Sequence, residues 1–127
     1  MTLSLGFVHR PSNPYLNGKR AQVNIRKFFF DALPQVADVT FYGDDTRLDL
    51  TPHADKHDAW VFFDGVAWGW PDALLGVDKL KAPKVSFCGD PHGFDKVCPV
   101  YGRSRRQMFE EFAFDAYFFC ADINNWN

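Results

Sequence analysis

The residues best suited to chemistry gather in one short segment, Ser86–Asp95, which reads SFCGDPHGFD. Asp90 and His92 stand directly after an apolar run, and a carboxylate and an imidazole there can act as acid and base or bind a phosphate or a sugar. Gly89 allows the backbone to approach a ligand closely. We therefore predict Asp90 and His92 as catalytic residues and Gly89 as a ligand contact. The alternative is a polar turn in which Asp90 bonds its own backbone.

A second segment, Arg10–Gln22, has the features of an anion site. Asn17 and Gly18 precede a predicted helix, whose first backbone N–H groups favour an anion, and Lys19 adds positive charge. Residues 1–30 contain five lysines and arginines and no acidic residue. The spacing matches neither the P-loop nor the dinucleotide-binding glycine pattern. We predict that Asn17, Gly18 and Lys19 contact a ligand, and a plain helix start is the alternative.

Arginines also cluster at the start of the last predicted helix, in the stretch GRSRRQ. Positive charge at a helix N-terminus is unfavourable unless an anion or a carboxylate compensates it. Arg103 and Arg105 are therefore candidate phosphate ligands, and surface solubility is their alternative role. Ser104, with Gln107 three residues further on, has the spacing of a capping box.

The spacing of the other reactive side chains disfavours metal binding and nucleophilic hydrolysis. Cys88, His92 and Cys98 have ligand-type side chains, but no C-x-x-C pair is present, so we predict no metal site. Ser86 lies inside a predicted strand and not in a G-x-S-x-G turn, which argues against a serine nucleophile. The three cysteines, an odd number, favour free thiols in a reducing cytosol.

Five short apolar runs, separated by helix-length stretches, must position these segments. The runs are Leu3–Val8, Val39–Tyr42, Ala59–Phe63, Val85–Cys88 and Ala116–Cys120. Continuous apolar runs of this length are typical of parallel strands buried on both faces. We predict an α/β fold with a three-layer, doubly wound, Rossmann-like sheet of five parallel strands in the order 3-2-1-4-5. The polar turns after the strands then share one edge, where such sheets bind ligands.

The stretches between the runs predict helices. Lys19–Leu33 has apolar residues at helical spacing and ends at Pro34. A short helix is predicted between Pro71 and Lys81, since proline favours the first helical turn and four apolar residues follow it. The stretch Asp44–His57 is weakly patterned and predicts no more than a short helical turn.

Length and composition indicate a single domain over residues 1–127. A chain of this size buries roughly two-thirds of its unfolded surface and needs neither a disulfide nor a metal to fold. Its formal net charge of −2 gives no indication of nucleic-acid binding. No signal-peptide pattern is present, and no apolar run approaches the ~20 residues of a membrane span. We expect a soluble, cytoplasmic protein.

The layout resembles the N-terminal half of GT-B glycosyltransferases, the group that contains family 4 and the CgeB-like enzymes. Three segments carry the resemblance: the Asn17-Gly18 opening of a long helix, the Gly-Asp-Pro-His turn at Gly89–His92, and Phe114–Phe119, which is similar to a strand after a helix in those enzymes. The resemblance implies that the Asn17-Gly18 loop lies near the acceptor and the donor's phosphates. It also implies that Asp90 and His92 face the same cleft.

In that family a second domain with an acidic E-x(7)-E motif holds the sugar nucleotide. Glu110 and Glu111 are the only glutamates of this sequence, so the motif is absent. The resemblance therefore implies a glycosyltransferase-like domain that binds a sugar or a phosphate on the acceptor side. Its donor site is incomplete, it has no cofactor of its own, and a nucleotide sugar would require a C-terminal partner domain.

Two other classes of protein stay open. One is a non-enzymatic interaction module in which Trp68, Trp70 and Trp126 anchor a partner or a homodimer, unless these tryptophans pack over the sheet. The other is a small enzyme that binds a phosphate ligand and uses His92.

Overall fold

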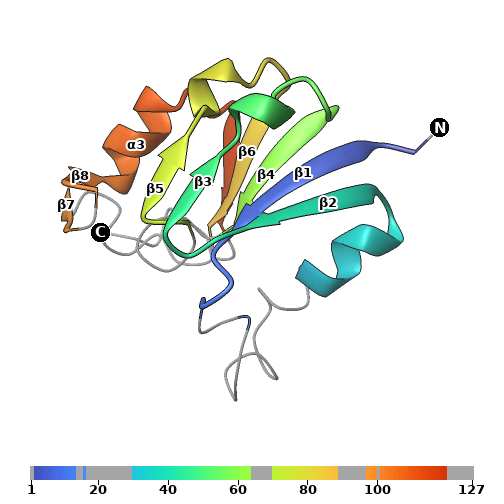
Figure 1. The fold of residues 1–127 in the computed structure, drawn as a ribbon, viewed down its shortest axis with the longest axis horizontal. Helices are drawn as coiled ribbons and strands as arrows, with labels where there is room; N and C mark the ends of the chain where they lie inside the picture. Colours follow the sequence, from blue (N-terminus) through green and yellow to red (C-terminus); the bar gives the residue numbers. More distant parts are fainter. Residues whose placement is uncertain are drawn as a thin grey trace.

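The computed structural model (Figure 1) describes residues 2–13, 16, 30–63, 70–88, 97–99 and 101–119. Its centre is a sheet of five strands: β1 (Ser4–His9), β2 (Asp38–Gly43), β4 (Ala59–Phe63), β6 (Lys84–Cys88) and β9 (Ala116–Phe119). Every neighbouring pair is parallel. The predicted α/β class with a parallel sheet is confirmed, and each predicted run coincides with a strand to within one residue at either end.

The strand order is β2-β1-β4-β6-β9, so the predicted order 3-2-1-4-5 is wrong. The third strand along the chain, β4, pairs with β1 on the side opposite β2. Burial explains the difference, because the last four residues of β4 are buried, whereas β2 has no buried residue. β2 can therefore stand at the edge of the sheet. If β4 stood at the edge instead, as the predicted order requires, its apolar side chains would be exposed to water.

A smaller parallel sheet pairs β3 (Arg47–Asp49) with β5 (Ala73–Leu75), and a 3-10 helix follows each strand: η2 (Thr51–His53) and η3 (Val77–Lys79). The predicted helix between Pro71 and Lys81 is therefore wrong. Its apolar residues have helical spacing, but Gly76 takes φ +80°, which interrupts a right-handed helix. The expected short helical turn in Asp44–His57 is η2, while β3 was not predicted.

The last helix begins as the capping box predicts. β7 (Val97–Cys98) and β8 (Arg103–Ser104) pair antiparallel ahead of α3 (Arg105–Glu111). The Gln107 N–H donates to Ser104 Oγ at 3.2 Å, and the Ser104 N–H donates to Gln107 Oε1 at 2.9 Å. Both orphan N–H groups are therefore satisfied by the sequence's own side chains.

The same helix ends in a Schellman turn without glycine. The N–H of Phe114 donates to the carbonyl of Phe109, and the N–H of Ala113 donates to that of Glu110, each at 3.2 Å. Ala113 takes φ 55°, the left-handed conformation that this turn requires. The rings of Phe109 and Phe114 lie 5.1 Å apart and supply the apolar contact that accompanies such turns.

Two buried apolar clusters lie on opposite faces of the main sheet, as the alternation of side chains along β1 and β4 requires. The first, covered by the β3–β5 sheet and α3 (Figure 1), consists of Val8, Leu50, Trp60, Phe62, Trp70, Leu74, Val77, Leu80, Met108 and Phe109. The second consists of Leu5, Phe7, Ala37, Val61 and Phe63.

Trp70 belongs to the first cluster and has no exposed surface. Its ring contacts those of Phe62, Phe109 and Phe114, with centroids 5.7 to 5.9 Å apart. The interpretation of Trp70 as an anchor for a partner is therefore wrong, because a side chain enclosed in the core has no surface to offer. Trp68 and Trp126 lie outside the described residues.

Most of the predicted Lys19–Leu33 helix lies outside the described residues. Its end is described, since Phe30–Ala32 is helical and continues into η1 (Leu33–Gln35). Phe30 and Leu33 pack against the second cluster. Within the described ranges, no helix combines the length and the apolar character needed to cross a membrane.

Candidate functional site

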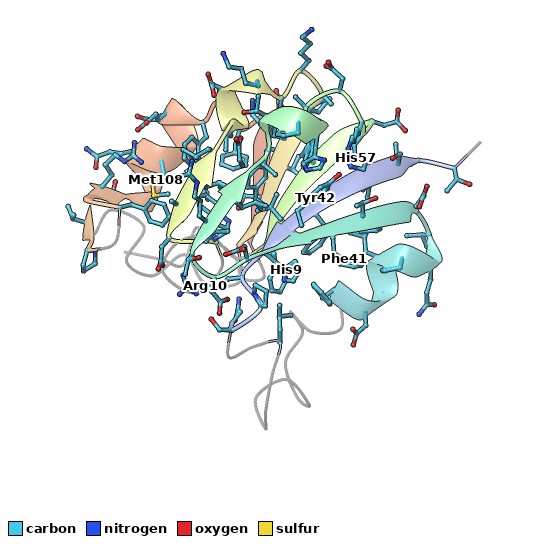
Figure 2. The ribbon with its side chains drawn as sticks, in the orientation of Figure 1. His9, Arg10, Phe41, Tyr42, His57 and Met108 are labelled. Atoms are coloured by element: carbon cyan, nitrogen blue, oxygen red, sulfur yellow. The ribbon has the colours of Figure 1, made fainter. Side chains whose placement is uncertain are left out.

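β1 is the strand at which the chain changes direction across the sheet. From β1 the chain passes to β2 on one side, and later to β4 on the other. In open parallel sheets, the crevice beyond the carboxyl ends of the strands at such a switch point is the usual place for a ligand. His9, the last residue of β1, and Arg10, which follows it, lie at this point (Figure 2).

The guanidinium of Arg10 connects three loops at this edge. Its Nη1 lies 2.5 Å from Asp72 Oδ1 and 3.3 Å from the Trp70 carbonyl oxygen. Its Nε lies 3.1 Å from Ser12 Oγ and 4.0 Å from Asp45 Oδ1. The Arg10 side chain is 19% exposed, whereas those of Asp45 and Asp72 are 43% and 46% exposed. We term Arg10, Asp45 and Asp72 the arginine hub.

Backbone hydrogen bonds hold the three loops in place around the hub. The Asp72 N–H donates to the Asp45 carbonyl at 3.0 Å, and the Ser12 N–H donates to Asp45 Oδ1 at 2.9 Å. The Tyr101 hydroxyl donates to the Pro71 carbonyl, which joins the segment before α3 to the same loop. The hub is therefore a fixed arrangement of one positive and two negative charges.

His9 lies near the hub in aromatic surroundings. Its ring centroid is 6.2 Å from that of Phe7, 5.2 Å from that of Phe30 and 5.9 Å from that of Phe41. Burial lowers the pKa of His9, and the Asp45 carboxylate partly opposes this effect. Nδ1 is buried and has no hydrogen-bond partner among the residues that the structure describes. The lowered pKa favours the neutral imidazole, and its Nδ1 lies inside the protein, where it is not exposed to a ligand.

A second histidine, His57, forms a bridge near the start of β1. Its Nδ1 lies 2.9 Å from Ser4 Oγ and its Nε2 lies 2.6 Å from the Tyr42 hydroxyl. Burial lowers the pKa of His57, so the ring is neutral and offers one donor and one acceptor, both of which are used. The bridge ties β1, β2 and the segment before β4 together, away from Arg10 (Figure 2). We interpret it as structural.

Six of the predicted site residues lie outside the described residues: Asn17, Gly18, Lys19, Gly89, Asp90 and His92. The strand that leads to Gly89, β6, runs parallel to β4 in the same sheet, so its carboxyl end lies at the edge that carries the hub. The roles of these six residues stay predictions. Ser86 is fully buried within β6 and its Oγ donates to the Phe62 carbonyl at 3.3 Å, which agrees with the exclusion of a serine nucleophile.

The guanidinium of Arg103 interacts with residues of α3 and of the turn that follows it. Its Nη1 forms an ion pair with Glu111 at the end of α3, and its guanidinium carbon lies 5.9 Å from the centre of the Phe112 ring. A carboxylate thus compensates the charge of Arg103, as the unfavourable helix position requires. Of Arg105 only the backbone, at the first position of α3, is described. Phosphate binding by either arginine stays a prediction.

The hub residues were not assigned from the sequence, although Arg10 is the first of the basic residues in the second segment, Arg10–Gln22. Asp45 belongs to the polar turn after β2, and Asp72 follows Pro71 in a stretch predicted as helix. A usable signal was present, since Arg10 and Asp45 each follow an apolar strand by one or two positions. Nothing local indicated Asp72.

Within the described part of the chain, no three histidine, cysteine, aspartate or glutamate side chains are placed to hold a metal ion. No protein-family model matches the sequence, and no curated protein or solved structure is significantly similar to it. The structural class is therefore defined by the fold alone: an α/β domain with a polar constellation at the switch point of a parallel sheet.

Proposed function

We propose that this protein is a glycosyltransferase-like, Rossmann-like domain that binds the acceptor at the carboxyl edge of its sheet. The observation that carries the proposal is the position of the arginine hub, directly after β1 at the switch point between β1 and β4. Three loops hold the polar groups at this position in place before a ligand arrives. Because these groups are already ordered, the protein loses less conformational entropy when the ligand binds.

The resemblance to the N-terminal half of GT-B glycosyltransferases supplies the ligand class in this proposal. Asp90 and His92 follow β6, and we assign them the reacting end of the acceptor. The Asn17-Gly18 loop and Lys19 follow β1, and we assign them contacts to a phosphate. The proposal includes an incomplete donor site, because the sequence contains no E-x(7)-E motif.

Binding can be mapped by two-dimensional amide NMR on the isotope-labelled chain. The ligands are free mono- and disaccharides, their phosphates, and nucleotide sugars such as UDP-glucose. We expect at least one sugar or sugar phosphate to shift the amides of residues 9–13, 44–46 and 70–73, and to leave those of Asp38 and Asp58 unchanged. Shifts only at the opposite end of the sheet, or none with any ligand, would contradict the proposal.

A turnover assay tests the part of the proposal that the donor site is incomplete. The chain by itself should release nucleotide from a nucleotide sugar no faster than a heat-denatured sample. Efficient glycosyl transfer by the chain alone would show that the donor site is complete, and this part of the proposal would be wrong.

A further inference from the structure

The arginine hub has the polarity of a site for hydroxyl groups. Arg10, Asp45 and Asp72 carry charges of +1, −1 and −1, which sum to −1. An anion at Arg10 would have to approach two carboxylates that are already in place. Like charges a few ångströms apart repel each other, and the anion would meet two carboxylates for a single guanidinium.

The donors of Arg10 that face the hub are already in use. Nε donates to Ser12 Oγ, and Nη1 donates to Asp72 Oδ1 and the Trp70 carbonyl. A phosphate is bound best by a guanidinium that offers two parallel N–H groups. Such a ligand would have to displace Asp72, whose oxygen lies at 2.5 Å, so the hub as it stands does not offer that fork.

The carboxylates, in contrast, retain accepting capacity. Asp72 bonds through Oδ1, and Asp45 likewise bonds through Oδ1 to the Ser12 N–H. No hydrogen bond within the described ranges uses Oδ2 of either residue, and both side chains are almost half exposed. A hydroxyl group can donate to such an oxygen without bringing charge to the hub, whereas an anion would be repelled by the two aspartates.

We propose that the arginine hub binds hydroxyl groups of an uncharged, sugar-like part of the ligand, and that Asp72 excludes anions from Arg10. This inference rests on the proposed acceptor site and specifies its chemistry: the hub holds the neutral sugar, and any phosphate of the ligand lies elsewhere along the edge. Asp72 is in this sense a specificity-determining residue.

The test compares the wild-type chain with Asp72→Asn by NMR titration. The variant removes one negative charge and keeps an oxygen that can accept from Arg10, and the backbone bond from Asp72 to Asp45 does not involve the side chain. The matched control is Asp78→Asn on η3, an exposed aspartate paired with Lys79 and outside the hub. The probes are inorganic phosphate and the free sugar that gives the largest shifts with the wild-type chain.

We expect phosphate to leave the amides around Arg10 unshifted in the wild-type chain, and to bind there at least about tenfold more tightly in Asp72→Asn. The free sugar should bind more weakly to Asp72→Asn than to the wild-type chain, and Asp78→Asn should change the affinity for neither ligand.

If phosphate binds at Arg10 of the wild-type chain as tightly as in Asp72→Asn, the inference is wrong and the acceptor site still stands. If a ligand binds the edge but Asp72→Asn leaves the free sugar unchanged, the hub is not its site. If no ligand binds at this edge, the proposed function is wrong, and the inference about the arginine hub is wrong as well.

Discussion

The indole of Trp60 lies directly over Gly6 in the neighbouring strand. The two residues are paired in register across β1 and β4, and a Cβ added to Gly6 would stand 2.5 Å from Cε3 of Trp60. The same Cβ would stand 2.8 Å from Cδ2 of His57. The missing side chain at Gly6 thus leaves room for the buried ring of Trp60 and for the ring of His57, which forms the histidine bridge.

We therefore expect Gly6→Ala to destabilise the protein by about 1–3 kcal/mol, the usual cost of overpacking a core. Chemical denaturation of the wild-type chain and the variant measures the difference in the free energy of unfolding. A double-mutant cycle with Trp60→Leu provides the control, because the smaller side chain leaves room for the methyl group. Additive effects in that cycle would show that Gly6 does not act through Trp60.

The two half-buried histidines predict a loss of stability in mild acid. Burial lowers the pKa of both His9 and His57 below the ordinary value of 6.5, so the unfolded chain takes up these protons more readily than the folded one. Their contribution is fully present above about pH 6.5 and is lost as the pH falls through their folded pKa values. Unfolding free energies measured between pH 7.5 and pH 5 should fall in the wild-type chain.

The variant His57→Gln isolates the part due to the bridge. It should be less stable than the wild-type chain at pH 7.5, and its stability should depend less on pH between 7.5 and 5. Asp44 and Asp49 have pKa values lowered by backbone N–H groups, of Arg47 and Thr51 respectively, and they act in a separate window below about pH 4. An equal pH dependence in the wild-type chain and the variant would contradict this account of His57.

One substitution in the Schellman turn after α3 should raise the stability of the protein. Ala113 holds φ 55° and its side chain is exposed, so glycine removes the steric cost of the left-handed conformation and leaves the packing unchanged. We expect Ala113→Gly to stabilise the protein by up to about 1 kcal/mol. Ala32→Gly is the matched control, because Ala32 is also exposed but takes a right-handed φ of −81°. That control should lose stability, and a gain at both positions would point to an effect other than the turn.

The capping box predicts a measurable cost when its hydroxyl is removed. Ser104 is buried and its Oγ accepts from the Gln107 N–H, so Ser104→Ala leaves this donor without its partner. We expect a loss of about 1 kcal/mol in the free energy of unfolding. Ser104→Asp restores an acceptor at the same place and should recover part of the loss. Equal losses in the two variants would indicate that the volume of the side chain, and not the cap, is what matters.

The sequence by itself determined the parts of the fold that depend on a few neighbouring residues. The five apolar runs became parallel strands because each run is long enough to form a strand and too short and too apolar for a surface helix. The start of α3 followed from Ser104 and Gln107, whose side chains reach only their own helix turn. In Pro71–Lys81 the same local reasoning failed, because the conformation of Gly76 breaks the helix that its neighbours favour.

Only the tertiary structure decided the order of the strands and the composition of the site. The position of β4 beside β1 depends on which strands must be buried on both faces, and that comparison involves the whole sheet at once. Arg10 and Asp72 are 62 residues apart and meet because two loops end at the same edge. Contacts of this range leave no periodicity in the sequence, since the free energy that forms them comes from closing the core, and local residue types do not encode it.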